Sequence, residues 1–402
     1  MADKFLHGIE VVELDGGARP VQTVTSSVIG LIGTAPQGPV NTPTLILGNK
    51  TEAVKIFGED TEGYTIPAAL NGILDQTGAV VVVINVADPE NVDHLGDDGE
   101  LDPTTITEAD IVGGTNADGT YTGVQALLAA QSECAVQPRI LIAPGFTHTT
   151  PDGSTSNPVV DALTTIAERL RAVIIADCPN GTKEQATQFQ KKISSPRVYS
   201  VYPWAKVLKG DTVVEEPFSA RVAGVIAKSD NDRGFWYSPS NQIINGIAGV
   251  SKPIDFTLGD AACVANYLNE NNVATVIQQD GFRLWGNRTA SADAKWCYLS
   301  IRRTADMIND SLLKAHLWAV DRNITKTYKD DVVEGVNNYL RYLKNIGAII
   351  NGQCWADPAL NAADQVQQGK ITFDFDFTAP YPAEHITFRS RLTTDYLEEI
   401  FE

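Results

Sequence analysis

Residues 80–86, which read VVVVINV, are the feature that most constrains the fold of this chain. A strand with apolar side chains on both faces must be covered on both sides, as a central strand of a parallel sheet is. Similar runs predict strands at 28–34, 44–47, 140–143, 173–176 and 198–202, and helical segments are predicted at 52–57, 66–76, 159–171 and 183–192. Strands that alternate with helices in this way predict an α/β fold with a mainly parallel sheet.

The pattern changes after Gly281, where two long amphipathic helices are predicted at 305–320 and 330–344. They are followed by residues 370–377, KITFDFDF, the cleanest polar–apolar alternation in the chain. Because alternate residues of a strand point to opposite faces, we expect a half-buried strand that can serve as a sheet edge. Its apolar face would carry Ile371, Phe373, Phe375 and Phe377, and its polar face Thr372, Asp374 and Asp376.

Each end of the chain carries a short segment of strand-forming character, set off from the rest by a hinge. The apolar positions are Ile9, Val11 and Leu14 at one end and Ile386, Phe388 and Leu392 at the other, with hinges at Gly16, Gly17, Pro380 and Pro382. Such a strand buries an apolar face only when it pairs. The pattern leaves open whether each arm pairs with its own domain or with the sheet edge of another subunit. Exchange at both ends would give rings or helical polymers.

Composition excludes several classes of protein. The net charge of −19 argues against a nucleic-acid partner, which needs clustered Lys and Arg. No apolar run approaches the roughly 18 residues of a membrane span. The first residues contain no secretory segment, so we expect a cytoplasmic protein. The five cysteines are odd in number and scattered, which indicates reduced thiols rather than disulfides or a zinc site.

Motifs for catalysis are missing from the sequence. Residues 28–33 lack the third glycine of a dinucleotide-binding loop, and no Gly-Lys-Ser/Thr follows the glycines at 113–119. The five histidines form no close metal-binding pair. His316 lies on the apolar face of its predicted helix, and we expect it to be a core histidine. No nucleophile elbow is present. We therefore predict no catalytic residue, cofactor or metal. An α/β enzyme that binds a nucleotide or small ligand at its strand ends is the alternative.

Residues 88–110 contain many Asp and Glu and no Lys or Arg. Clustered oxygens can bind calcium. The spacing of an EF-hand is absent, however, and acidic runs are usually solvated loops. We interpret the segment as a solvated loop.

Several ordered blocks resemble the contractile tail sheath proteins of bacteriophages, most closely those of P2-like phages and R-type pyocins. The most specific block is DGFRLWGNRT at 280–289. The other blocks are HGIEV at 7–11, SSVIGLIGTAP at 26–36, GTYTG at 119–123, PRILIAPG at 138–145, HLWAVDRNIT at 316–325 and GKI at 369–371. The resemblance covers nearly the whole chain.

The resemblance implies a subunit of stacked six-membered rings around an inner tube, which contract to drive the tube through the target envelope. It favours arm exchange with neighbours over arms that fold back. The implied partners are the chain itself, the inner tube protein, and baseplate and tail terminator proteins. The implied location is the virion tail, assembled in the host cytoplasm. A secretion-system sheath is less similar because it uses a two-protein arrangement.

Taken together, we expect an α/β fold, α+β overall. The expected parts are an N-terminal arm at 1–24, an α/β outer region at 25–275, a C-terminal core sheath domain at 276–385 and a C-terminal arm at 386–402. Trp285, Arg288, Trp318 and Asp321 are predicted to belong to the C-terminal core and its buried polar pairs, because aromatic and Arg residues pack and pair more often than they catalyse.

Overall fold

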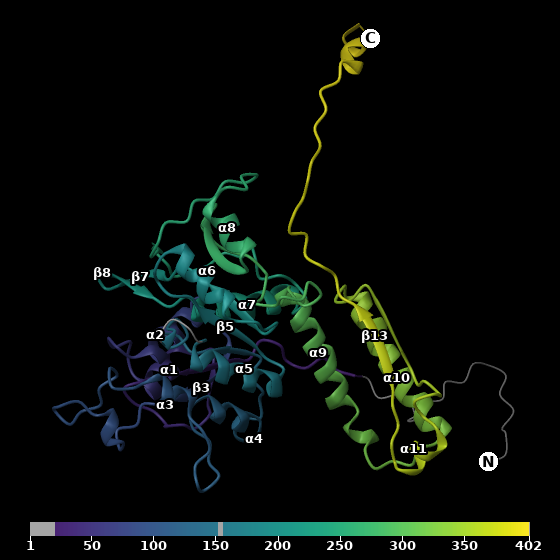
Figure 1. The fold of residues 1–402 in the computed structure, drawn as a ribbon, viewed down its shortest axis with the longest axis horizontal. Helices are drawn as coiled ribbons and strands as arrows, with labels where there is room; N and C mark the ends of the chain where they lie inside the picture. Colours follow the sequence, from purple (N-terminus) through teal and green to yellow (C-terminus); the bar gives the residue numbers. More distant parts are fainter. Residues whose placement is uncertain (1–20, 152–155, 402) are drawn as a thin grey trace, which may run out of the picture.

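The computed structural model describes residues 21–151 and 156–401, and its centre is an eight-stranded sheet (Figure 1). The strand order is β11-β10-β6-β5-β4-β1-β3-β2. The strands are β1 (Ile29–Gly33), β2 (Thr44–Leu47), β3 (Val80–Asn85), β4 (Ile140–Ile142), β5 (Val173–Asp177), β6 (Val198–Val201), β10 (Val273–Gln278) and β11 (Phe282–Trp285). The six inner strands run parallel, and the edge strands β2 and β11 are antiparallel to their neighbours.

Helices cover both faces of this sheet, which is why its inner strands are apolar on both sides. One face packs against α1 (Lys50–Phe57), α2 (Thr65–Leu74) and α7 (Ser219–Arg233). The opposite face packs against α3 (Glu108–Val112), η2 (Gly123–Ala129), α4 (Ala130–Glu133), α5 (Pro158–Leu170), α6 (Lys183–Lys191) and α8 (Val264–Glu270). Asn157 caps α5 ahead of Pro158, and Thr182 and Gln185 form a capping box on α6. A small sheet of β7 (Ala205–Lys209), β8 (Thr212–Glu216) and β9 (Gly249–Val250) completes the body.

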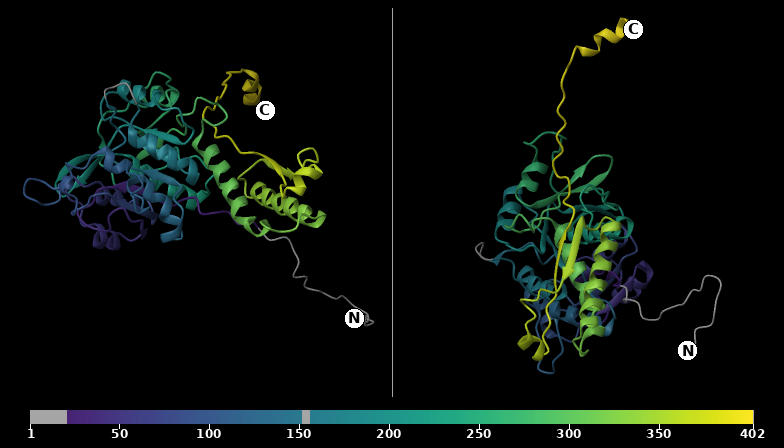
Figure 2. Two further views of the ribbon diagram at one scale, coloured as in Figure 1. Left: turned by 60° about the horizontal axis from the view of Figure 1, so that its bottom comes forward. Right: turned by 90° about the vertical axis from the view of Figure 1, so that its right-hand side faces the viewer.

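A second lobe, the C-terminal module, follows the body (Figures 1 and 2). Its elements are α9 (Leu299–Ala315), η4 (Leu317–Ala319), α10 (Lys326–Asn345), β12 (Asn351–Trp355), α11 (Ala363–Gln367) and β13 (Asp374–Thr378). The module has its own apolar core, to which Met307, Tyr339 and Phe375 contribute. Beyond β13 the chain runs away from both lobes and ends in the short helix η5 (Asp395–Phe401).

The predicted α/β fold is confirmed, and every strand predicted between residues 28 and 202 is present. Three elements of the C-terminal half have bounds that differ from the predicted ones. The helix expected at 305–320 starts at Leu299 and stops at Ala315, and the helix expected at 330 starts at Lys326. The strand expected from 370 starts at Asp374. The domain boundary expected after residue 275 falls inside β10, because β10 and β11 continue the body sheet.

Candidate assembly interface

A two-stranded antiparallel sheet lies in the C-terminal module. β12 and β13 pair from Asn351 opposite Thr378 to Trp355 opposite Asp374. The side chains of Cys354, Phe375 and Phe377 pack on the inner face, in the core that α9 and α10 share. So short a pair of strands is marginal by itself, and the helices behind it supply the packing that it needs.

The outer edge of β12 is closed by α10. The Asn337 amide donates to the Cys354 carbonyl at 2.9 Å, and its Oδ1 accepts from the Cys354 backbone N–H at 2.8 Å. A neighbouring strand would make the same two hydrogen bonds. A helix side chain therefore takes the place of a strand at this edge.

The outer edge of β13 has no such cover. Within residues 21–151 and 156–401, β13 pairs with β12 alone. The chain just before β13 is engaged, because Asn361 bonds the Thr372 carbonyl at 2.9 Å and the Thr372 N–H at 2.7 Å. An unpaired strand edge presents main-chain donors and acceptors to another strand. β13 is therefore the candidate acceptor edge.

The structure separates the four residues predicted on this edge. Phe373, Phe375 and Phe377 pack against the module core, and the rings of Phe375 and Phe377 stack with centroids 6.3 Å apart. Ile371 lies outside the strand and outside this core. The hydrogen bonds from Asn361 hold the chain near Ile371 in a loop, and this explains the later start of β13.

The N-terminal arm residues Ile9, Val11 and Leu14, and the hinge residues Gly16 and Gly17, lie outside the described residues. The described chain begins beside the C-terminal module. Its first residues bond α10 and α9: Thr23 Oγ1 lies 3.0 Å from Tyr339 Oη, and the Val24 N–H donates to Ser311 Oγ at 3.1 Å. Both arms therefore join the rest of the chain at or next to this module.

The C-terminal arm is anchored where it leaves β13. Past Pro380 and Pro382, the Glu384 carboxylate accepts two hydrogen bonds from Arg288, at 2.8 and 2.5 Å, and one from Tyr298 Oη at 3.1 Å. The hydrogen bonds and charge of Arg288 lower the pKa of Glu384. The paired side chains are each more than a third exposed. The two predicted hinge prolines thus lie between β13 and a fixed point at residue 384.

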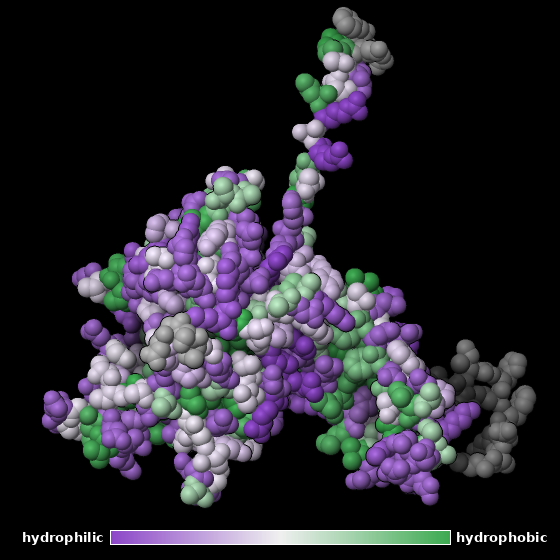
Figure 3. Space-filling model, in the orientation of Figure 1, coloured by the Kyte–Doolittle hydropathy of each residue, from purple (hydrophilic) through white to green (hydrophobic). Residues whose placement is uncertain are grey.

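Beyond this anchor the arm is extended and exposed (Figures 1 and 3). The exposed fractions of Ile386, Phe388 and Leu392 are 68%, 93% and 99%. In η5, Tyr396 and Ile400 are 69% and 70% exposed. The arm does not fold back on its own chain, which was the alternative left open by the sequence.

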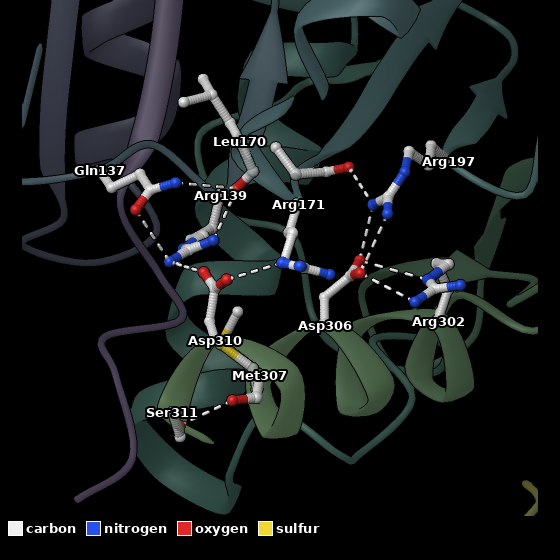
Figure 4. Close-up of polar contacts among 11 residues, drawn as sticks. Gln137, Arg139, Leu170, Arg171, Arg197, Arg302, Asp306, Met307, Asp310 and Ser311 are labelled. Atoms are coloured by element: carbon white, nitrogen blue, oxygen red, sulfur yellow. Dashed lines mark hydrogen bonds and ion pairs between the residues drawn. The ribbon is translucent and has the colours of Figure 1, made fainter. Parts of the chain in front are cut away.

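A buried ionic junction joins the module to the body (Figure 4). Three arginines lie just before the neighbouring parallel strands β4, β5 and β6: Arg139, Arg171 and Arg197. Their side chains therefore meet at the end of the sheet where these strands begin. Helix α9 brings two aspartates, one turn apart, to that end of the sheet. Asp310 pairs with Arg139 and, at 2.9 Å, with Arg171.

Asp306, the second aspartate, binds Arg197 through two hydrogen bonds of 2.7 and 3.0 Å, and it also binds Arg302 of its own helix at 2.8 Å. Asp306 is only 1% exposed. Asp230 of α7 adds a further buried pair with Arg303. Buried charges are costly unless paired and hydrogen-bonded. This junction therefore fixes α9, and with it the whole module, in one position on the body.

The crevice where an α/β enzyme would bind its ligand is filled. The strand order reverses between β1 and β4, the usual ligand position in such sheets. There the Thr34 N–H donates to Thr65 Oγ1 at 3.0 Å, and a Cβ on Gly33 would lie 2.2 Å from the same oxygen. Open cavities of about 520 and 740 Å³ lie elsewhere, at 181–184 with 252–254 and at 40–43 with 116–122.

Within the part of the chain that the structure describes, no His, Cys, Asp or Glu cluster is arranged to hold a metal ion. The acidic segment 88–110 instead folds around buried His94. Its Nδ1 accepts from the Asp88 N–H at 3.0 Å, and its Nε2 lies 3.4 Å from Asp110. The five cysteines are free thiols. No described helix combines the length and the apolarity that crossing a bilayer requires.

Two predictions about the module's interior are wrong. His316 is half-buried at the end of α9, with Nδ1 2.7 Å from the Leu312 carbonyl, rather than in the core. Trp285 packs on Phe256 in the body because it ends β11, and Arg288 anchors the arm. The remaining two residues lie between α9 and α10: Trp318 is half-buried in η4, and Asp321 is exposed in the loop that follows.

Three family models match the chain in sequence. The phage tail sheath protein central domain matches residues 119–290, and the phage tail sheath C-terminal domain matches residues 291–393. The N-terminal region of domain III of tail sheath protein Gp18 matches residues 26–86. The boundary near residue 290 lies between β11 and α9, where the body sheet gives way to the module.

Full-length relatives agree with these models. A putative prophage major tail sheath protein of Pseudomonas aeruginosa is 41% identical over 405 residues, covering 99% of each chain. The tail sheath protein of Escherichia phage P2 is 34% identical over 406 residues, covering 98% of each. The contracted helical sheath of the anti-feeding prophage shares the fold, with a TM-score of 0.68, 21% identity and coverage of 98% of this chain and 100% of that one. These relatives are structural tail proteins and not enzymes. The chain belongs to the phage tail sheath protein family.

Proposed function

We propose that this sheath subunit polymerises by passing its terminal arms to neighbouring copies, with the free edge of β13 as an acceptor. The observation that carries the proposal is the C-terminal arm, in which Phe388 and Leu392 are almost wholly exposed. Contiguous exposed apolar side chains mark interaction sites. The arm alternates apolar and polar residues, as a strand with one buried face does. A neighbouring sheet edge satisfies both its backbone and its apolar face.

The energetics favour a persistent link. Burying Ile386, Phe388 and Leu392 contributes roughly 5–9 kcal/mol at about 1.5–3 kcal/mol for each side chain. Each added main-chain hydrogen bond contributes about 1 kcal/mol net. Ordering the arm and fixing the subunit offset part of this gain. The remainder keeps neighbours tethered while weaker contacts between bodies break and re-form.

Contraction in this scheme is the relaxation of a metastable assembly through a rearrangement of packed interfaces, with no nucleotide hydrolysis. The ionic junction keeps each subunit rigid, so rotation falls on the arms. Gly16, Gly17, Pro380 and Pro382 are the proposed hinges. The Arg288–Glu384 anchor adds a further pivot, beyond residue 384.

The proposed partners follow from the family. The chain assembles with itself as stacked hexameric rings in the virion tail, surrounds an inner tube protein, and meets baseplate and tail terminator proteins at the two ends. Solved structures of this fold include a helical sheath and a baseplate of the anti-feeding prophage, which supports self-assembly and contact with a baseplate. Assembly takes place in the cytoplasm of the bacterial host.

Deletion of residues 386–402 tests the proposal. We expect the wild-type chain to form long hollow cylinders in negative-stain micrographs, and the deletion variant to sediment as a monomer with an unchanged melting temperature. A matched variant of full length, Ile386→Ser with Phe388→Ser and Leu392→Ser, separates loss of the apolar face from loss of the chain. Deletion of residues 1–15 should block assembly in the same way. Normal cylinders from these variants would contradict the arm model.

A further inference from the structure

The charges on β13 and on the C-terminal arm are complementary. On β13, Asp374 and Asp376 alternate with Phe375 and Phe377. In the arm, Arg389 and Arg391 alternate with apolar Phe388 and Leu392, with Ser390 between them. Both strands have the same period of two, so a register that buries the arm's apolar face also brings its two cations beside the two carboxylates.

These four charged groups have no partner of opposite charge in the described chain. None of them takes part in an ion pair within residues 21–151 and 156–401. Among the described residues, the Asp376 carboxylate accepts hydrogen bonds from Gln353 alone, from its N–H at 3.1 Å and its side-chain amide at 3.5 Å, and both arginines are exposed. In a chain with a net charge of −19, two arginines without an acidic partner at alternate positions of an extended segment are a specific feature.

The other two strands that could compete for this pairing are excluded by charge or by cover. The N-terminal segment 5–14 contains no Lys or Arg, and its Glu10 alternates with apolar Ile9 and Val11, so a register that buries these two would bring a negative charge beside the carboxylates of β13. The edge of β12 is occupied by the Asn337 amide at Cys354. The free edge of β13, which is acidic, is therefore left with one arm of opposite charge, the C-terminal arm.

We infer that the C-terminal arm of a second copy adds directly to the free edge of β13, with Arg389 and Arg391 facing Asp374 and Asp376, and that this charge register selects the C-terminal arm over the N-terminal arm. The inference rests on the proposed arm exchange and names its partner strand. Its consequence is an order of strands: β12, β13, then the arm of a neighbour. The arm's own outer edge, flanked by its cations, is then open to the acidic N-terminal segment.

A charge-reversal pair tests the register. Variant A carries Asp374→Arg and Asp376→Arg, and variant B carries Arg389→Asp and Arg391→Asp. Each variant alone faces like charges, so its critical concentration for polymerisation should rise about tenfold, measured by sedimentation. In an equimolar mixture, the acceptor of A meets the arm of B and the acceptor of B meets the arm of A. The mixture should polymerise at the wild-type concentration, with the two variants in equal amounts in the pellet.

The chain offers matched controls. A chain with all four substitutions should polymerise alone, which excludes misfolding as the cause of the single-sided defects. Asp97→Arg with Asp98→Arg makes the same change in net charge on the exposed acidic loop and should leave assembly unchanged. Normal polymerisation of A and B alone, or no recovery in their mixture, would overturn the register. If deletion of residues 386–402 also left assembly intact, arm exchange itself would be at fault.

Discussion

The body buries its large apolar side chains, whereas the arm that follows the C-terminal module exposes them. Phe57 of α1 is fully buried in the body, whereas Phe388 of the arm is 93% exposed. The inner strands of the body sheet have partners on both sides, whereas β13 has one. The body is therefore complete as a single chain. The module and its arm leave apolar surface and main-chain groups without a partner in the described residues, and we propose that another copy provides it.

This difference separates stability from assembly. Apolar burial within one chain sets the free energy of unfolding, while burial between chains sets the concentration at which they polymerise. In a contractile sheath, this division would let the body stay intact while the contacts between copies change.

The largest expected effect comes from two matched Phe→Ala substitutions. Phe57→Ala removes a buried ring and should lower the free energy of unfolding by about 3–5 kcal/mol, measured by denaturant titration of the monomer. Phe388→Ala should leave that free energy unchanged, because its ring has little contact with its own chain. It should instead raise the critical concentration for polymerisation by about thirtyfold or more, from about 2 kcal/mol of lost burial.

The comparison would fail if Phe388→Ala destabilised the monomer, since its ring would then have a partner within the chain. Thr393→Ala, in the same arm and on its polar face, is the control for both measurements.

The second prediction concerns the joint between the two regions. Asp306→Asn removes the charge that Arg197 and Arg302 share, and leaves two largely buried guanidinium groups without a carboxylate partner. We expect a loss of about 3 kcal/mol in the free energy of unfolding. Asp93→Asn, at an exposed position, should have no effect. Wild-type stability in Asp306→Asn would mean that the ion pairs of Asp306 contribute nothing to the attachment of α9.

Asp177 gives the body its own pH dependence. It is fully buried and accepts hydrogen bonds from Phe218, Ser219 and the Ser219 hydroxyl at the start of α7. Burial raises its pKa from 3.8 to about 6. Between these values the folded chain holds a proton that the unfolded chain has lost. Stability therefore falls as pH rises through this window, by about 3 kcal/mol at about 1.4 kcal/mol per unit.

Denaturant titrations at pH 4, 5, 6 and 7 check this sign. The difference between wild type and Asp177→Asn should shrink or reverse by about 3 kcal/mol across the series, because Asn does not titrate. A constant difference would show that Asp177 ionises at the same pH in both states.

Much of the body, and the family itself, could be predicted from the sequence, and the assignment to the tail sheath family is confirmed. A run such as Val80–Asn85 predicts a central strand of a parallel sheet, because such a strand is apolar on both faces. The ordered blocks identified the family. The region 203–275 went unassigned, because α7 is buried on most sides and carries no amphipathic period.

The interface could be predicted only in part. The apolar arm is visible in the sequence because its alternation is local. The closure of β12 by Asn337 depends on residues 17 positions apart, and the Arg288–Glu384 anchor on residues 96 apart. The junction of Asp306 and Arg197 spans 109 positions. Polar residues that pair over such distances have no periodic pattern, so only the fold brings them together.

The smallest expected effect belongs to the Arg288–Glu384 anchor, and its pH dependence has the opposite sign to that of Asp177. Arg288 lowers the pKa of Glu384 below its usual 4.5. The anchor is therefore fully formed above 4.5 and is lost as pH falls through the lower folded value. Because the pair is more than a third exposed, Glu384→Gln should cost at most about 1 kcal/mol of stability.

The main effect of Glu384→Gln should appear in the direction of the arm. Spin labels at residues 383 and 392, each measured against one at exposed Glu168 of α5 in the body, should give a narrow distance distribution at 383 and a broad one at 392. Glu384→Gln, or acidification below the folded pKa, should broaden the first distribution. Glu399→Gln in η5 is the matched control. An unchanged distribution at residue 383 would place the fixed point of the arm at Pro380 and Pro382, and the pivot with it.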